Sequence, residues 1–82
     1  MVIHDPNIGD NFAIVKVELV VDEIIPFGKV QITNRWRAAG KSLANKCDFN
    51  GKLVQIDAGY VDENWQRTQE FTFYFDLGEN EE

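Results

Sequence analysis

Residues 65–77 read WQRTQEFTFYFDL, and this stretch decides the fold class of the chain. Its three phenylalanines fall on every second position and alternate with threonine, tyrosine and aspartate. A period of two indicates a β-strand, because successive side chains of a strand point to opposite faces. Residues 12–21, FAIVKVELVV, alternate in the same way, although Ile14 and Val20 make their second face partly apolar. We therefore predict two strands here, the earlier one covered on both faces.

The middle of the chain allows two interpretations. Residues 29–37, KVQITNRWR, alternate between apolar and polar side chains, which predicts another strand. The dipeptide Asn50-Gly51 is typical of a type I′ turn, so the segments on either side of it are predicted to pair as a hairpin. The alternative is a short helix over residues 38–46, since short apolar patterns do not distinguish the two structures.

Together these segments predict a mainly β fold with an antiparallel sheet of about five strands. Such a sheet closes as a partly open barrel or packs in a dimer. The alternative is an α+β fold with one short helix near 38–46. We expect a single β domain over 12–77, an N-terminal arm over 1–11 and an acidic tail over 78–82. The predicted core consists of Val15, Val17, Leu19, Val21, Val30, Ile32, Trp36, Val54, Ile56, Phe71, Phe73 and Phe75.

Charge is unevenly distributed along the 82 residues. The chain has 14 acidic and 8 basic residues, a net charge of −6. Residues 29–52 contain six of the basic residues and one acidic residue, so the two ends of the chain are strongly acidic. A basic middle with acidic ends can attract other copies of the chain or present one basic face to an anion. The same pattern also arises on a surface that is only solvated.

Residues suited to nucleophilic catalysis are scarce. The chain has one histidine, His4, one serine, Ser42, and one cysteine, Cys47. His4 belongs to the expected arm, and Cys47 falls on the apolar face of the predicted hairpin, where a free cysteine packs as a small hydrophobic residue. Without a nucleophile beside a base, we expect a protein that is not an enzyme.

Acidic pairs and metal-ligand motifs give no stronger indication of chemistry. Asp62 and Glu63 are neighbours in a turn, and Asp48 would lie near Asp57 across the predicted hairpin, but neither pair is associated with a cleft. The chain contains no CxxC or HxxxH spacing and no glycine-rich phosphate loop. We therefore expect no metal and no cofactor.

Aromatic and basic residues define a candidate pocket or anion contact. In the predicted strand 29–37, Arg35 and Arg37 point away from Trp36, so the guanidinium groups would lie on the polar face. The net charge of −6 argues against nucleic acid as the partner, because non-specific affinity for it is electrostatic. The candidate residues are Asn34, Arg35, Trp36, Arg37, Tyr60, Trp65 and Arg67.

An excess of apolar residues outside the predicted core indicates self-association. They exceed what a monomer of this size can bury, and a contact between two copies would cover them. The candidate surface consists of Phe12, Ile14, Val20, Ile24, Ile25, Phe27, Leu53 and Tyr74.

The leading hypothesis for function is therefore a homo-oligomeric β-module that acts by binding. The alternatives are a small-molecule binding protein with an aromatic-lined pocket, and an acidic interaction blocker or nucleic-acid-associated accessory protein. Besides another copy of the chain, an unknown protein or a small apolar ligand remains a candidate partner. No apolar run is long enough to cross a bilayer, and the N-terminal residues lack the pattern of a secretory signal, so we expect a cytoplasmic protein.

Overall fold

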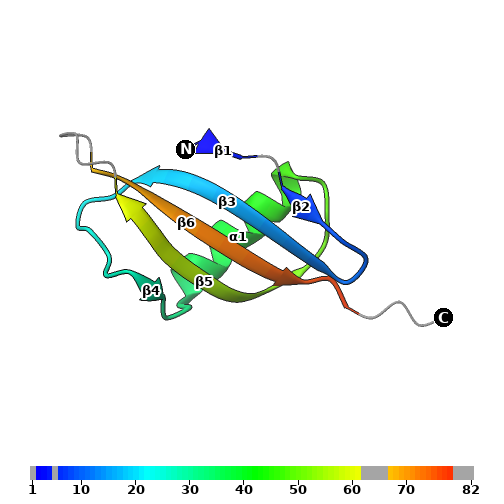
Figure 1. Ribbon diagram of the computed structural model, residues 1–82. Coiled ribbons are helices and arrows are strands. Elements are labelled where there is room, and N and C mark those ends of the chain that lie inside the picture. Colours follow the sequence, from blue (N-terminus) through cyan, green and yellow to red (C-terminus); the bar gives the residue numbers. More distant parts are fainter. Residues whose placement is uncertain (1, 5, 62–66, 79–82) are drawn as a thin grey trace.

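The computed structural model describes residues 2–4, 6–61 and 67–78, and one antiparallel sheet dominates it. Six strands make up the sheet in the order β1-β3-β6-β5-β4, with β2 also paired to β3. They are β1 (Val2–Ile3), β2 (Asn7–Ile8), β3 (Phe12–Val20), β4 (Gly28–Lys29), β5 (Lys52–Val61) and β6 (Thr68–Asp76). Helix α1 (Asn34–Lys46) connects β4 to β5 and lies across one face of the sheet (Figure 1). The predicted mainly β fold is confirmed, and the sheet stays open instead of closing into a barrel.

The three long strands form the centre of the sheet, with β6 between β3 and β5. Strand β3 pairs with β6 over nine consecutive positions, from Phe12 opposite Asp76 to Val20 opposite Thr68. This register puts the three phenylalanines of β6 on the same face as Val15 and Val17, and that face is buried. The two strands predicted from alternation are therefore confirmed, except that the second begins at Thr68.

The N-terminal segment, expected to form an arm, adds two short strands along β3. Strand β1 pairs near Val17 and Glu18, and strand β2 pairs near Ala13 and Ile14. The backbone N–H of His4 donates a hydrogen bond to the carbonyl oxygen of Lys16 at 2.9 Å. These bonds satisfy part of an edge that β3 would otherwise leave unpaired.

The strand predicted over residues 29–37 is wrong, because a helix begins inside it. Thr33 is the N-cap of α1, and its hydroxyl oxygen accepts a hydrogen bond from the backbone N–H of Trp36 at 3.4 Å. Helical spacing then brings Trp36 onto the core side, where its ring lies 5.2 Å from that of Phe71 and 5.9 Å from that of Phe73. The alternative helix near 38–46 is therefore present and starts four residues earlier, at Asn34.

The hairpin predicted at Asn50-Gly51 is also wrong, because the preceding residues end the helix. Asp48 adopts a left-handed backbone with φ of 64°, and the N–H of Phe49 donates to the carbonyl oxygen of Ala44 at 3.0 Å. A left-handed residue followed by this bond is a common way to satisfy the last carbonyls of a helix. Asn50 and Gly51 then lead into β5, so Asp48 does not pair across a hairpin with Asp57.

The core lies between α1 and the inner face of the sheet. Val54, predicted to be buried, is 51% exposed, because a bulge between Leu53 and Gln55 shifts the register of β5. Five further predicted core residues are half-buried, namely Leu19, Val21, Val30, Ile32 and Trp36. The buried residues are Ala13, Val15, Val17, Gly40, Leu43, Ala44, Ile56, Ala58, Gln69, Phe71, Phe73 and Phe75. Within the described ranges, no helix is long and apolar enough to span a membrane.

Candidate functional site

The first candidate surface is the face of the sheet that α1 leaves uncovered. At one end of this face, side chains from β3, β5 and β6 surround a hollow of about 470 Å³, which we call the sheet-face hollow. Ile14 and Tyr74 are cross-strand partners, and Gln55 lies opposite Tyr74 on the other side. The residues that line the hollow are Asn11, Phe12, Ala13, Ile14, Val54, Gln55, Tyr74, Phe75 and Asp76.

Tyr74 gives this hollow a polar anchor. Burial, together with the charge of Asp57 and a hydrogen bond to its carboxylate, raises the pKa of Tyr74 above its ordinary value. The side-chain amide of Gln55 also donates to Asp57, at 3.0 Å. The phenolic O–H of Tyr74 donates a hydrogen bond to the Asp57 carboxylate, while the ring lies in the apolar part of the face.

A second polar group lies further along the same face. The Nε2 atom of His4 is 2.9 Å from a carboxylate oxygen of Glu18, and Glu18 lies directly opposite Glu70 on β6. One ligand atom from each of the three residues falls within 4.8 Å of the others. An imidazole and two carboxylates are ligands that Zn²⁺ accepts. The sequence gives no indication of this cluster, because His4 is expected in an arm and lies instead beside β3.

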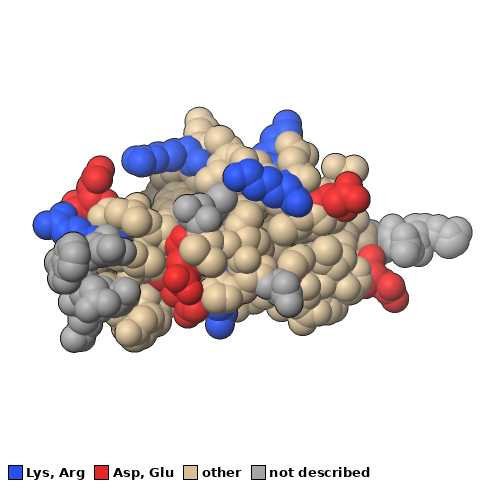
Figure 2. Space-filling view, turned by 90° about the horizontal axis from the view of Figure 1, so that it is seen from above, with Lys and Arg blue, Asp and Glu red and all other residues tan. Residues whose placement is uncertain are grey.

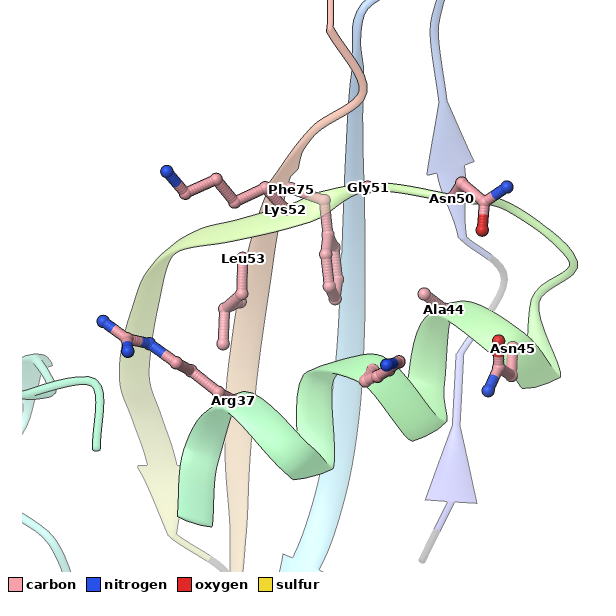
Figure 3. Close-up of a pocket in the computed structure, with 9 residues that line it drawn as sticks. Arg37, Ala44, Asn45, Asn50, Gly51, Lys52, Leu53 and Phe75 are labelled. Atoms are coloured by element: carbon pink, nitrogen blue, oxygen red, sulfur yellow. The ribbon is translucent and has the colours of Figure 1, made fainter. Parts of the chain in front are cut away.

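The second candidate surface is a groove between α1 and the start of β5, which we call the helix–strand groove (Figure 3). Its volume is about 490 Å³. Gly40 lets the helix approach β5 closely, since a Cβ there would lie only 3.0 Å from the side chain of Leu53. The residues that line the groove are Arg37, Lys41, Ala44, Asn45, Asn50, Gly51, Lys52, Leu53 and Phe75.

The helix–strand groove is basic around an apolar floor. Leu53 and Phe75 point from the sheet towards α1, whereas Arg37 and Lys52 extend to one side of the groove (Figure 3). Lys41 adds a third positive charge, and none of the described residues that line the groove is acidic. Figure 2 shows the molecule from above, so its upper border is the side on which α1 lies behind the sheet in Figure 1. Lys and Arg side chains gather along this border.

The predicted self-association residues divide between the surface and the core. Phe12, Ile14 and Tyr74 meet at the sheet-face hollow, and Val20 lies at the far end of β3, 74% exposed. Ile24 and Phe27 are exposed in the loop between β3 and β4, at 42% and 68%. Ile25 and Leu53 turn inwards and pack against the core. The structure thus brings together three of the eight residues, and Val54 joins them.

Gln69 explains why Ile25 turns inwards. Its side chain is fully buried and donates to the carbonyl oxygen of Ile25 at 2.7 Å, while its oxygen accepts from the N–H of Ile25 at 3.0 Å. This pair of bonds fastens the loop after β3 to the central strand. Both bonds link residues far apart in sequence, so local patterning gave no indication of them.

The predicted pocket residues do not form one site. Asn34, Arg35, Trp36 and Arg37 lie on the first turn of α1, and of these only Arg37 lines the groove. Trp36 packs on phenylalanine rings of the core. Tyr60 is 66% exposed, Arg67 donates a hydrogen bond to the carbonyl oxygen of Asp22, and Trp65 lies outside the described residues.

Lys41, Lys52 and the two asparagines of the groove are not among the site residues predicted from the sequence. The sequence feature that could have indicated them is the excess of positive charge over residues 29–52. It identifies this region of the chain but not the geometry of the groove. The groove forms only once α1 replaces the predicted strand, because Arg37 and Lys41 then lie one helical turn apart.

Cys47 follows α1 and is half-buried against the core. Burial raises the pKa of the Cys47 thiol above its usual range. A raised pKa lowers the fraction of thiolate at neutral pH, and the thiolate is the reactive form. The core role predicted for Cys47 therefore agrees with its position.

Comparison with protein-family models, curated proteins and solved structures finds no match to this chain.

Proposed function

We propose that this chain is a non-enzymatic binding module that works as a homodimer, joined through the uncovered face of the sheet. The observation that carries the proposal is the sheet-face hollow, where Phe12, Ile14, Val54 and Tyr74 bring apolar surface together on the side opposite α1. A second copy packed on this face would remove that surface from water, which is the main driving force of association. Two sheets packed face to face are a standard arrangement of β proteins.

The charges beside the hollow favour a second copy as the occupant. The uncovered face carries Lys16 next to Glu18 and Glu70, so both signs lie on one surface. A two-fold axis sets each patch of one copy against the same surface of the other. A two-fold contact that sets Lys16 of one copy against Glu70 of the second would form this pair twice, which favours pairing over repulsion.

The residues available for chemistry support binding over catalysis. Cys47 is half-buried with a raised pKa, and His4 is hydrogen-bonded to Glu18 at the edge of the sheet. Neither arrangement is a nucleophile activated by a base. A cytoplasmic location, where a single cysteine stays reduced, belongs to the same proposal.

The test is the size of the protein in solution, measured by size-exclusion chromatography with light scattering. The wild-type chain should be a dimer at micromolar concentration. Val54→Lys, at a half-exposed position of the hollow, should give a monomer with unchanged thermal unfolding when compared at a concentration where both are monomeric. Ala38→Lys, at an exposed position of α1, is the control and should remain a dimer. A dimer that survives Val54→Lys would overturn the proposed interface.

A further inference from the structure

The helix–strand groove has the composition of a site for an anion, and the proposed dimer does not use it. It is lined by three basic side chains, from Arg37, Lys41 and Lys52, and by two side-chain amides, from Asn45 and Asn50. Across the described residues, the only ion pair is the one between His4 and Glu18, on another part of the molecule. Among the described residues, no carboxylate forms an ion pair with any of the three basic groups of the groove.

We propose that the helix–strand groove binds a small phosphorylated ligand that also has an apolar or aromatic part. The basic groups would hold the phosphate, with Arg37 able to donate two parallel hydrogen bonds to its oxygens. Asn45 and Asn50 add amide donors at the other end of the groove (Figure 3). Half-buried Leu53 offers an apolar floor for a ring, and the buried Phe75 lines the groove beside it.

The first turn of α1 adds no negative charge beside Arg37. It contains no acidic residue, although acidic side chains are favoured there because the helix N-terminus carries partial positive charge. Arg35 and Arg37 occupy that turn instead. No carboxylate in that turn therefore competes with an external anion for Arg37, the one residue of the turn that lines the groove.

The size of the groove and the net charge favour a small ligand over a nucleic acid. About 490 Å³ is within the usual range of small-molecule sites, roughly 300–1,000 Å³. A long polyanion would extend beyond the basic region and meet the acidic remainder of a chain whose net charge is −6. In Figure 2, acidic side chains indeed lie in the middle and at the ends of the molecule.

Calorimetric titration with ADP as the probe, against adenosine and inorganic phosphate, tests the proposal. ADP should bind to the full chain, with an affinity at least about tenfold higher than either fragment, since only ADP engages both the cations and the floor. Binding should weaken as salt is raised, because the exposed charges are screened. No detectable binding of ADP at millimolar concentration would overturn the proposal.

Two double variants with the same change in charge separate a site from general attraction. Arg37→Gln with Lys52→Gln removes two cations of the groove, and should weaken ADP binding by about tenfold or more. Arg35→Gln with Lys46→Gln removes two exposed cations of α1 outside the groove, and should have little effect. Equal losses in both variants would overturn the proposal, as would an oligonucleotide that binds more tightly than ADP.

The outcome is separable from that of the proposed dimer. The groove opens beside α1, whereas the proposed interface lies on the opposite face of the sheet. Val54→Lys should therefore give a monomer that still binds ADP with unchanged affinity. Loss of ADP binding in this variant would contradict the placement of the ligand.

Discussion

Gln69 is the residue with the most specific structural role. It follows the same two-residue period as Phe71 and Phe73, so its place on the inner face could be predicted from the sequence. Its partner could not, because Ile25 is 44 positions away and reaches Gln69 only through the path of a loop. Local patterns give the face of a side chain, whereas long-range hydrogen bonds depend on the complete fold.

Replacing Gln69 with methionine should destabilise the protein by about 1–3 kcal/mol, the usual cost of leaving buried polar groups without partners. Methionine has a similar size, so the loss would come from the N–H and C=O of Ile25. Urea unfolding measures it, with the exposed Gln31→Met as the control. An unchanged midpoint for Gln69→Met would show that the two bonds contribute nothing to stability.

Tyr74 should titrate above its ordinary pKa, and Asp57→Asn should lower the midpoint. Burial is the larger cause of the shift and remains in this variant, so the pKa should stay above the ordinary value. In a Tyr60→Phe background Tyr74 is the only tyrosine, so tyrosinate absorbance gives its midpoint. Asp76→Asn, which makes the same change of charge on the same face, should leave the midpoint where it was.

The sign of the accompanying stability change follows from the raised pKa. The unfolded chain releases the Tyr74 proton at about pH 10, whereas the folded chain keeps it to higher pH. The contribution of Tyr74 to the free energy of unfolding is therefore fully present below about pH 10. It is lost as the pH rises through the pKa of Tyr74 in the folded chain. In Asp57→Asn this loss between neutral and alkaline pH should be smaller.

At the scale of elements, alternation predicted the two long strands β3 and β6, and it failed where a helix and a strand share the same pattern. Residues 29–37 alternate, but Trp36, Gly40, Leu43 and Cys47 also fall three or four positions apart, which is helical spacing. Thr33 at the N-cap and the left-handed Asp48 at the other end decide between them. A helix of this length is marginal by itself, so it depends on packing its apolar face against the sheet, which local sequence does not reveal.

Gly40 should be intolerant of a larger side chain. Gly40→Val would place methyl groups against Leu53, so we expect the free energy of unfolding to fall by about 1–3 kcal/mol, as for other overpacked cores. Ala38→Val, at an exposed position of the same helix, should change it by only a few tenths of a kcal/mol. Equal effects of the two substitutions in urea unfolding would show that the close approach to β5 is unimportant.

At the scale of the whole molecule, charge and apolar surface are separated by the layer of the sheet. The helix side carries the basic groove, and the opposite side carries the apolar hollow with its mixture of charges. The basic middle of the sequence predicted a basic surface, and its excess of apolar residues predicted an exposed apolar surface. The sequence could not predict which residues meet, because the bulge at Val54 and the inward turn of Ile25 alter the exposed set.

Pairing through the uncovered sheet face is tested most directly by sedimentation velocity of the wild-type chain over the micromolar range. The predicted result is a species of twice the mass of one chain, which dissociates on dilution to a monomer. A single species with the mass of one chain at every concentration would contradict it.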